Sequence, residues 1–243
     1  MPAQTKLKAP PSSARPALDR ARPERTETAL LALGCFWSPD ALFGALPGVV
    51  ATASGYAGGA KADPTYRALG DHTETVEVTF DLDELSYEDL LAVFFEHHDS
   101  TRRSWKRQYR SALFVLDEDQ AATARRSKAE RNEHVDAEVR TAVERVARFH
   151  LAEGYHQNHR LRQFEAFERV YAERYPETAD FARSTAASRV NGYLAGHGSS
   201  EQLEREIGTL GLPTEGLQDE LRRRHERGGR VSIWQRLFGN AKQ

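Results

Sequence analysis

Hydrophobic and polar residues alternate most regularly in the segment TETVEVTFD, residues 73–81. Successive side chains of a β-strand point to opposite faces, so every second residue from Glu74 to Phe80 shares one face. The pattern predicts a strand that buries this face in the core. Glu74 is the exception on it, because the other members of the face are apolar.

Other apolar runs and helical stripes predict the elements around this strand. Further strands are predicted at residues 28–33, 49–56, 109–116 and 138–146, and helices at residues 39–46, 87–98 and 119–134. Ser86 and Asp89 form a capping-box pattern at the start of the second helix. Strands and helices mix without the regular rhythm of parallel β/α units, so the predicted fold class is α+β.

Beyond residue 160 the pattern becomes helical to the end of the chain. Helices are predicted around residues 161–171, 179–194, 201–210 and 215–227, with Gly and Pro between them. Residues 1–27 are rich in Pro, Ala, Ser and Arg, a composition that predicts a disordered tail. The expected organisation is a disordered tail at 1–27, a principal domain at 28–160 and a helical extension at 161–243.

The composition excludes several classes of function. The chain is 39% hydrophobic and 29% charged with a formal net charge of -2, so it carries no overall positive field that would attract nucleic acid. No apolar run is long enough to span a bilayer, and residues 1–27 lack the apolar centre of a secretory signal. One cysteine forms no intramolecular disulfide, which favours a reducing compartment. We therefore expect a cytoplasmic protein with neither nucleic-acid nor membrane partners.

The single cysteine lies in the segment ALGCFWSPDALFGAL, residues 32–46. The first predicted strand ends at Gly34, and Ser38 is the predicted N-cap of the following helix. Cys35 is thus expected near the positive end of a helix dipole, which lowers the pKa of a thiol and makes it a nucleophile. The alternative is that Cys35 is a small buried hydrophobe, the commoner fate of a lone intracellular cysteine.

Glu74, Tyr56 and Tyr109 are candidate proton donors. Burial on the apolar face would raise the pKa of Glu74 and keep the carboxyl protonated near neutrality, unless the residue lies at a wet sheet edge. The two tyrosines lie at predicted strand ends, where a hydroxyl can enter a cleft, although packing alone explains either of them. With a thiolate and the rings of Phe36 and Trp37, these groups suit the reduction of a polarised S–O bond.

Several segments together resemble one protein family. GCFW, GYAGG, DPTY, TETVEVTFD, SYEDLLAVFFEHHD, QYRSA and AEGYHQ occur in the order and spacing of peptide methionine sulfoxide reductase A, over about residues 28–160. The resemblance implies that this segment is a catalytic domain with a two-layer α/β sandwich related to the ferredoxin-like fold. It also implies thiol-dependent reduction of methionine S-sulfoxide, in peptides or free, without a cofactor or a metal ion.

The resemblance further implies a role for each matching residue. The expected catalytic residues are Cys35, Glu74, Tyr56 and Tyr109, and the expected substrate-binding residues are Phe36, Trp37, Ser104 and His156. Cys35 would be the nucleophile and Glu74 the proton donor, while the two tyrosines would hydrogen-bond the sulfoxide oxygen. The aromatic residues after the cysteine would cradle the methyl group, and the attack would leave methionine and a Cys35 sulfenic acid.

The chain departs from the family pattern in three ways. Many members carry further cysteines that resolve the sulfenic acid, and this chain has none, so an external thiol is expected: thioredoxin, glutaredoxin or a low-molecular-weight thiol. The familiar GNDxGTQYRS reads RRSWKRQYRS, which makes the pocket rim around Ser104 larger and more basic. The familiar GHAE reads DHTE, with Asp71 and Thr73 at changed positions. A small or acidic sulfoxide is therefore an alternative substrate.

Two other classes of function are alternatives. His97, His98, Asp99, His156 and His159 offer ligands for zinc or a similar ion. Against this hypothesis, the chain has no HExxH pattern, and His98 fits the core stripe of its helix. The second alternative is a redox sensor in which Cys35 oxidises once without turnover.

Overall fold

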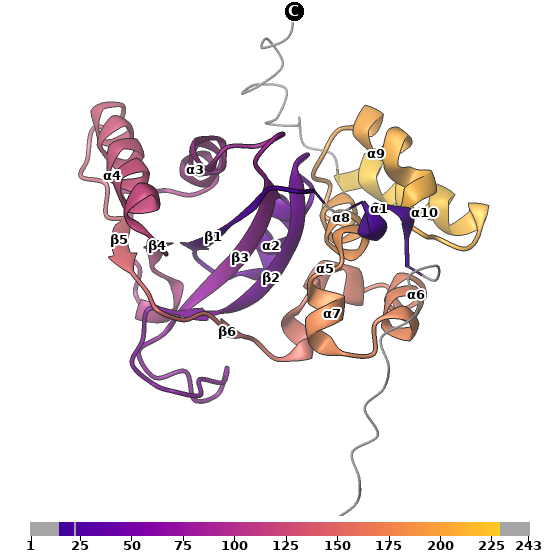
Figure 1. Cartoon of the computed structure of the whole chain (residues 1–243), viewed down its shortest axis with the longest axis horizontal. Coiled ribbons are helices and arrows are strands. Elements are labelled where there is room, and N and C mark those ends of the chain that lie inside the picture. Colours follow the sequence, from indigo (N-terminus) through magenta and orange to yellow (C-terminus); the bar gives the residue numbers. More distant parts are fainter. Residues whose placement is uncertain (1–14, 22, 229–243) are drawn as a thin grey trace, which may run out of the picture.

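The computed structural model describes residues 15–21 and 23–228, and within them six strands form one sheet in the order β5-β4-β1-β3-β2-β6 (Figure 1). The strands are β1 (Thr26–Leu33), β2 (Val49–Ala57), β3 (Thr73–Asp81), β4 (Ser111–Val115), β5 (Ala142–Arg145) and β6 (His150–Leu151). The β4–β5 pair is parallel and the other pairs are antiparallel. The strand predicted at residues 73–81 is confirmed with the same bounds.

Helices cover the sheet and extend beyond one end of it. They are α1 (Ala17–Arg20), α2 (Trp37–Gly44), α3 (Tyr87–Glu96), α4 (Glu118–Glu133), α5 (His159–Arg162), α6 (Glu165–Arg174), α7 (Thr178–Ala182), α8 (Thr185–Leu194), α9 (Ser200–Glu206) and α10 (Glu215–Gly228). Short 3-10 turns lie at η2 (Arg107–Tyr109), η3 (Gly154–His156) and η4 (Ile207–Thr209). Figure 1 shows α6 to α10 gathered at the side of the sheet opposite α4.

The two faces of the sheet bury different sets of side chains. Alternate residues of β1, such as Leu31, pack into a core with α2, α3 and α4. The intervening residues, such as Leu30, pack in a smaller cluster that includes Phe114 and is bordered by Phe149. Helices on one face of a single sheet make the two-layer α/β sandwich that the resemblance implied. Ser86 and Asp89 form the predicted capping box at the start of α3.

The start of α2 differs from the prediction. Ser38 was the predicted N-cap, but the helix begins at Trp37, and Phe36 occupies the N-cap position without a side-chain cap. Ser38 is exposed, whereas Asp40, the predicted first-turn acid, is fully buried. The carboxylate of Asp40 accepts a hydrogen bond of 2.6 Å from Thr52 Oγ1 on β2. The sequence pattern missed this inward-facing carboxylate, which ties the first turn of α2 to the sheet.

Helix α8 packs directly against α2 and β2. A Cβ atom on Gly44 would lie 2.6 Å from the backbone oxygen of Ser188, and one on Gly192 would lie 2.6 Å from the backbone oxygen of Ala41. The absence of these side chains allows the two helices to approach closely. Although α8 lies in the predicted extension, it is thus part of the packing around α2.

The segment before β1 is partly ordered, although the composition predicted a disordered tail as far as residue 27. Asp19 in α1 accepts hydrogen bonds from Ser184 Oγ at 2.7 Å, from the Ala186 N–H at 2.8 Å and from the Tyr175 hydroxyl. These bonds hold α1 against α6 and α8, and β1 already begins at Thr26. The rest of the predicted tail, residues 1–14 and 22, lies outside the described residues.

The helical prediction beyond residue 160 is confirmed as far as residue 228, and residues 229–243 lie outside the described residues. Helices α6 to α10 share a second apolar cluster with its own buried aromatic rings, Phe167, Tyr171, Phe181 and Tyr193. The helix predicted at 179–194 is divided into α7 and α8, because Ser184 leaves the helical conformation and caps α8. None of the helices within residues 15–21 and 23–228 combines the length and apolar character needed to cross a bilayer.

Candidate active site

Cys35 lies at the turn that joins β1 to α2. Gly34 has a φ of +111°, a backbone conformation that only glycine adopts without strain, so it permits the sharp change of direction after the strand. Cys35 follows it as an exposed free thiol, and Phe36 and Trp37 begin the helix. The predicted position of the cysteine between strand and helix is confirmed.

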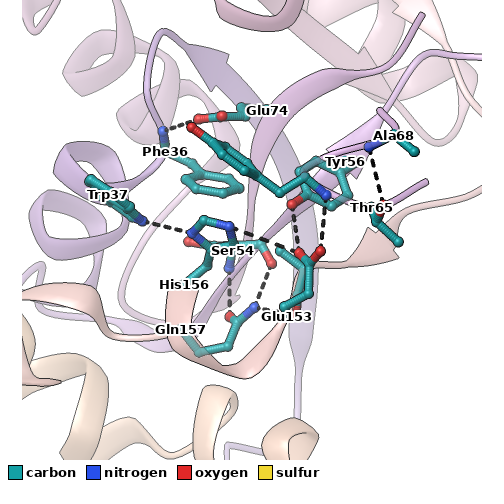
Figure 2. Close-up of polar contacts among 12 residues, drawn as sticks. Phe36, Trp37, Ser54, Tyr56, Thr65, Ala68, Glu74, Glu153, His156 and Gln157 are labelled. Carbon is teal, nitrogen blue, oxygen red and sulfur yellow. Dashed lines mark hydrogen bonds and ion pairs between the residues drawn. The ribbon is translucent and has the colours of Figure 1, made fainter. Parts of the chain in front are cut away.

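The Glu74 carboxyl group lies beneath this turn, on the helix-covered face of β3. The residue is 1% exposed, as the alternating pattern predicted. Glu74 Oε2 accepts a hydrogen bond from the Phe36 N–H at 3.2 Å (Figure 2), and Oε1 accepts one from Gln108 Nε2 at 2.7 Å. Burial raises the pKa of Glu74, and these two donors, together with Cys35, oppose the shift without cancelling it. Glu74 is therefore a buried carboxyl group with an elevated proton affinity.

The predicted lowering of the Cys35 pKa is wrong for the protein without substrate. Partial desolvation raises the pKa of the Cys35 thiol, and the negative charge of Glu74 raises it further. The backbone N–H of Trp37 lowers the pKa, but this one donor is outweighed. The sequence argument counted the helix N-terminus and left out the neighbouring carboxylate, which disfavours a second negative charge beside it.

Aromatic rings surround the space next to the thiol, and we call them the aromatic cup: Phe36, Trp37, Tyr66 and His156. The ring of His156 lies 4.9 Å from that of Phe36 and 4.8 Å from that of Tyr66, centroid to centroid. Trp37 Nε1 donates a hydrogen bond of 3.1 Å to His156 Nδ1 (Figure 2). Trp37 also stacks on His159 at 3.7 Å. The cup thus has a fixed indole wall.

A buried glutamine holds His156 in this position. Gln157 clamps β2, because its side-chain oxygen accepts from the Ser54 N–H at 2.9 Å and its Nε2 donates to the Ser54 oxygen at 2.8 Å (Figure 2). The sequence placed His156 in the substrate pocket. In the structure its buried ring packs against the other three members of the cup, and its Nδ1 atom orients the indole of Trp37.

The hydroxyl of Tyr56, predicted to bind the substrate oxygen, bonds to another residue in this structure, which leaves the predicted role untested. Tyr56 is 0% exposed, and its hydroxyl donates a hydrogen bond of 2.8 Å to Glu153 Oε2. It pairs with Glu74 across β2 and β3, so its ring packs beside the site. The second oxygen of Glu153 accepts from the Tyr66 N–H at 2.9 Å. Tyr56 thereby supports the loop that carries Tyr66.

Tyr66 is the tyrosine that joins Tyr109 at the site. A hydrogen bond between their side chains, together with partial burial and the charge of Glu74, raises the pKa of Tyr109. Cys35 also contributes to that shift, so the Tyr109 phenol lies close to the thiol. Tyr66 is 38% exposed and accessible from solvent. It lies in the DPTY motif, which was the signal available in the sequence, but Tyr56 at a strand end was chosen instead.

Comparison with known proteins identifies the family. The family profile for peptide methionine sulfoxide reductase matches residues 27–189. A peptide methionine sulfoxide reductase of Drosophila melanogaster is 39% identical over 191 residues, covering 77% of this chain and 76% of the relative. The chain belongs to the peptide methionine sulfoxide reductase A family. It reduces methionine S-sulfoxide to methionine with a thiol as the reductant.

Other reductases of this family agree in sequence and in fold. A peptide methionine sulfoxide reductase MsrA of Caulobacter vibrioides is 40% identical over 156 residues, covering 59% of this chain and 72% of the relative. The solved structure of methionine sulfoxide reductase A of Corynebacterium diphtheriae superposes with a TM-score of 0.54 at 28% identity, covering 68% of this chain and 91% of the other. The family match continues into α8, so the predicted boundary at residue 160 does not coincide with its end.

Ser104 lies on the loop where this reductase departs from the family pattern. Its hydroxyl donates to the Lys106 oxygen at 2.7 Å, so it stabilises its own loop. It also lines a cavity beside Gly34 and Tyr109, next to the reactive cysteine. These contacts do not test the substrate-binding role of Ser104, which stays a prediction.

The histidines considered for a metal site make other contacts. His97 Nδ1 and His98 Nδ1 each bond to a backbone oxygen of α3, at 2.8 Å, and His98 Nε2 bonds to Ser111 Oγ at 2.8 Å. His156 and His159 lie instead around Trp37. In the described part of the chain, no three His, Cys, Asp or Glu side chains are grouped closely enough to hold a metal ion.

Proposed function

We propose that Cys35 attacks the sulfur of the sulfoxide and that Glu74 delivers the proton its oxygen requires. The observation that carries this proposal is the contact between a thiol and a buried carboxyl group: burial raises the pKa of both, and Glu74 raises that of Cys35 further. Because a charge on Glu74 disfavours ionisation of the neighbouring thiol, the pair favours a state in which it holds one proton. The proton that leaves the thiol is then the one that Glu74 supplies.

The proposed step balances without an outside acid. The Cys35 sulfur forms a bond to the substrate sulfur while the S–O oxygen is protonated through Glu74. The substrate S–O bond and the transient S–S bond then break as the oxygen passes to Cys35, so the products are methionine and a Cys35 sulfenic acid. Substrate sulfur is reduced by two electrons and Cys35 sulfur is oxidised by two. The buried position of Glu74 supports this step, because burial raises its pKa and so favours the protonated form that donates the proton.

We propose that Tyr66 and Tyr109 hydrogen-bond the sulfoxide oxygen, whereas the sequence suggested Tyr56 and Tyr109. Their linked phenols lie beside Glu74 and Cys35, and two such donors stabilise the negative charge that develops on oxygen. The aromatic cup supports a position for the methyl group against Phe36 and Trp37. Tyr56 is a positioning residue through Glu153.

The sulfenic acid must be reduced by a thiol from outside the chain, because Cys35 is the only cysteine. Two external thiols convert the sulfenic acid to thiol and water while they form one disulfide. Thioredoxin, glutaredoxin and low-molecular-weight thiols remain the proposed classes of reductant. A need for reduced thiols supports a cytoplasmic location, which fractionation of cells that produce the protein would test.

Turnover separates the reductase from a redox sensor. The purified enzyme is given excess thiol and methionine S-sulfoxide, free or within a peptide, and methionine is quantified. We expect many product molecules per Cys35 and none with Cys35→Ser. Product limited to one equivalent per enzyme would instead support the sensor. Parallel assays with the R epimer and with acidic, non-methionine sulfoxides would identify another substrate if one of them had the higher kcat/KM.

A further inference from the structure

Two adjoining cavities lie along the loop that follows α3. The first, about 290 Å³, begins at Leu33 and Gly34 and includes Tyr109. The second, about 340 Å³, extends away from it toward Arg140. Arg102, Arg103, Ser104 and Ser111 line both, so we call the pair the basic groove. The groove starts at the residues that precede Cys35, whereas Phe36 and Trp37 of the aromatic cup follow the cysteine.

All the charged residues that line the outer part of the basic groove are cations. They are Arg102, Arg103, Lys106, Arg107, Arg110 and Arg140. Arg110 forms an ion pair with Glu144, and Arg107 donates to the backbone oxygens of Asp71 and Gly58. Asp99 lines the inner part, where hydrogen bonds from Thr101 and, to a smaller extent, the charge of Arg102 lower its pKa.

Four cations of the groove form no ion pair in the part of the chain that the structure describes, although Asp99 lies near Arg102. Within the described residues, no ion pair involves Arg102, Arg103, Lys106 or Arg140, although Lys106 Nζ lies 4.4 Å from the ring of Trp105. Like charges in one concave surface repel one another and attract an anion. The whole chain has a net charge of -2, so this positive field is local to the groove.

The volume and the position of the groove restrict the anion. Cavities of this size accept small molecules. Their volume is smaller than an extended acidic polypeptide requires. The enzyme has two substrates, and the aromatic cup accounts for the sulfoxide. The second substrate is a thiol, which must reach the sulfur of Cys35 because the chain has no other cysteine that could reduce it.

We propose that the basic groove binds the carboxylates of a low-molecular-weight thiol and directs its sulfur to the Cys35 sulfenic acid. This inference rests on the proposed function. The first thiol forms a mixed disulfide with Cys35 and releases water, and a second thiol then displaces Cys35 as the free thiol. The two external thiols are oxidised to a disulfide, and the sulfenic sulfur is reduced by the same two electrons.

The kinetic test compares a thiol with two carboxylates, glutathione, with the uncharged dithiothreitol at saturating methionine S-sulfoxide. The measured quantity is the ratio of the KM for glutathione to the KM for dithiothreitol. We expect this ratio to rise about tenfold in the double variant Arg103→Gln/Arg140→Gln, since exposed charge pairs each contribute modestly. It should also rise with ionic strength in the wild type. The matched control is Arg126→Gln/Arg169→Gln, which removes two exposed arginines from α4 and α6 and should leave the ratio at its wild-type value.

Binding of S-methylglutathione, which cannot reduce the sulfenic acid, tests the groove without turnover. Calorimetry should show saturable binding to the wild type and about tenfold weaker binding to the groove variant. No binding, or a ratio of KM values unchanged in that variant, would overturn the proposal. An increase in KM confined to an acidic sulfoxide peptide would assign the groove to the oxidised substrate and also overturn it. Binding of the thioether by an enzyme inactive with every thiol would refute the proposed function and retain the anion site.

Discussion

Two buried carboxyl groups lie near the start of α2: Glu74 on β3, in the active site, and Asp40 in α2 itself, in the contact with β2 and α8. Both have raised pKa values because both are removed from water. Glu74 accepts from Phe36 and Gln108 and also contacts a thiol. Asp40 accepts from Thr52 and from two asparagines, and no nucleophile is among the neighbours that set its pKa.

The contrast shows that burial alone does not identify a catalytic acid. A raised pKa is expected for either carboxyl group, whichever purpose it serves. The neighbours distinguish them: Glu74 faces Cys35 and two phenols at an accessible turn, whereas Asp40 is enclosed by hydrogen-bond donors from three segments. We therefore expect changes at Glu74 to affect rate and changes at Asp40 to affect stability.

The largest expected effect on rate is that of Glu74→Gln. The amide keeps the shape of the side chain but cannot supply a proton, so kcat should fall by about 10²–10⁴-fold. Single-turnover formation of methionine is the measurement, because it isolates the chemical step from regeneration of the thiol. The melting temperature should change little. A variant with the wild-type single-turnover rate would exclude Glu74 as the acid.

Asp40→Ala should instead destabilise the fold. Removing the carboxylate leaves three buried donors without their acceptor, those of Thr52, Asn158 and Asn191. We expect the free energy of unfolding to fall by about 3 kcal/mol, since each unsatisfied buried group costs roughly 1–3 kcal/mol and the site can relax. Urea denaturation at pH 7 measures it. Should the variant keep wild-type stability but lose single-turnover rate, the contrast between the two carboxyl groups would be reversed.

The sequence predicted the strand and helix pattern well where one residue pattern dominated. The alternation in β3 determined both its bounds and the burial of Glu74, and the capping pair at Ser86 and Asp89 marked the start of α3. These features depend on neighbours in the sequence. The resemblance to the reductase family then supplied the substrate, which no local pattern contains.

The features that the sequence did not predict depend on distant contacts. The pKa of Cys35 is raised, against expectation, first by burial and then by a carboxylate 39 positions away in the chain, which the strand register brings beneath the turn. Tyr66 was missed because its loop is placed by Glu153, a residue of another motif. The inward position of Asp40 depends on Asn191 in α8, which the sequence analysis had assigned to a separate extension.

The two carboxyl groups should also differ in how they respond to pH. The pKa of Asp40 is raised to about 6, so between its ordinary value and 6 the unfolded chain releases the proton first. Its contribution to stability is therefore present at low pH and is lost as the pH rises through 6. The stability of Asp40→Asn relative to wild type should improve by about 3 kcal/mol from pH 4 to pH 7. An unchanged difference across this range would show that Asp40 titrates normally.

The pH dependence of catalysis should follow the pair of Cys35 and Glu74. Activity requires one shared proton, so kcat/KM should fall in acid as the pair gains a second proton and in alkali as it loses the last one. Because the pKa of each group is raised, both limbs should lie above the ordinary values for a carboxyl group and a thiol. Single-turnover profiles measure both limbs. In Glu74→Gln the acid limb should disappear, and its persistence would assign that limb to another group.

The smallest expected effect on rate distinguishes Tyr66 from Tyr56. Tyr66→Phe removes a phenol that we place on the sulfoxide oxygen, so the single-turnover rate should fall about tenfold, the effect of losing one of two donors that share the charge. Tyr56→Phe removes only the bond to Glu153, and the rate should change less than threefold while the melting temperature falls by a few degrees, as loss of one buried hydrogen bond implies. The two variants differ from the wild type by the same single oxygen atom. If Tyr56→Phe lowered the rate more than Tyr66→Phe, the original assignment of Tyr56 to the substrate oxygen would be restored, and the aromatic cup would have to reorganise when substrate binds.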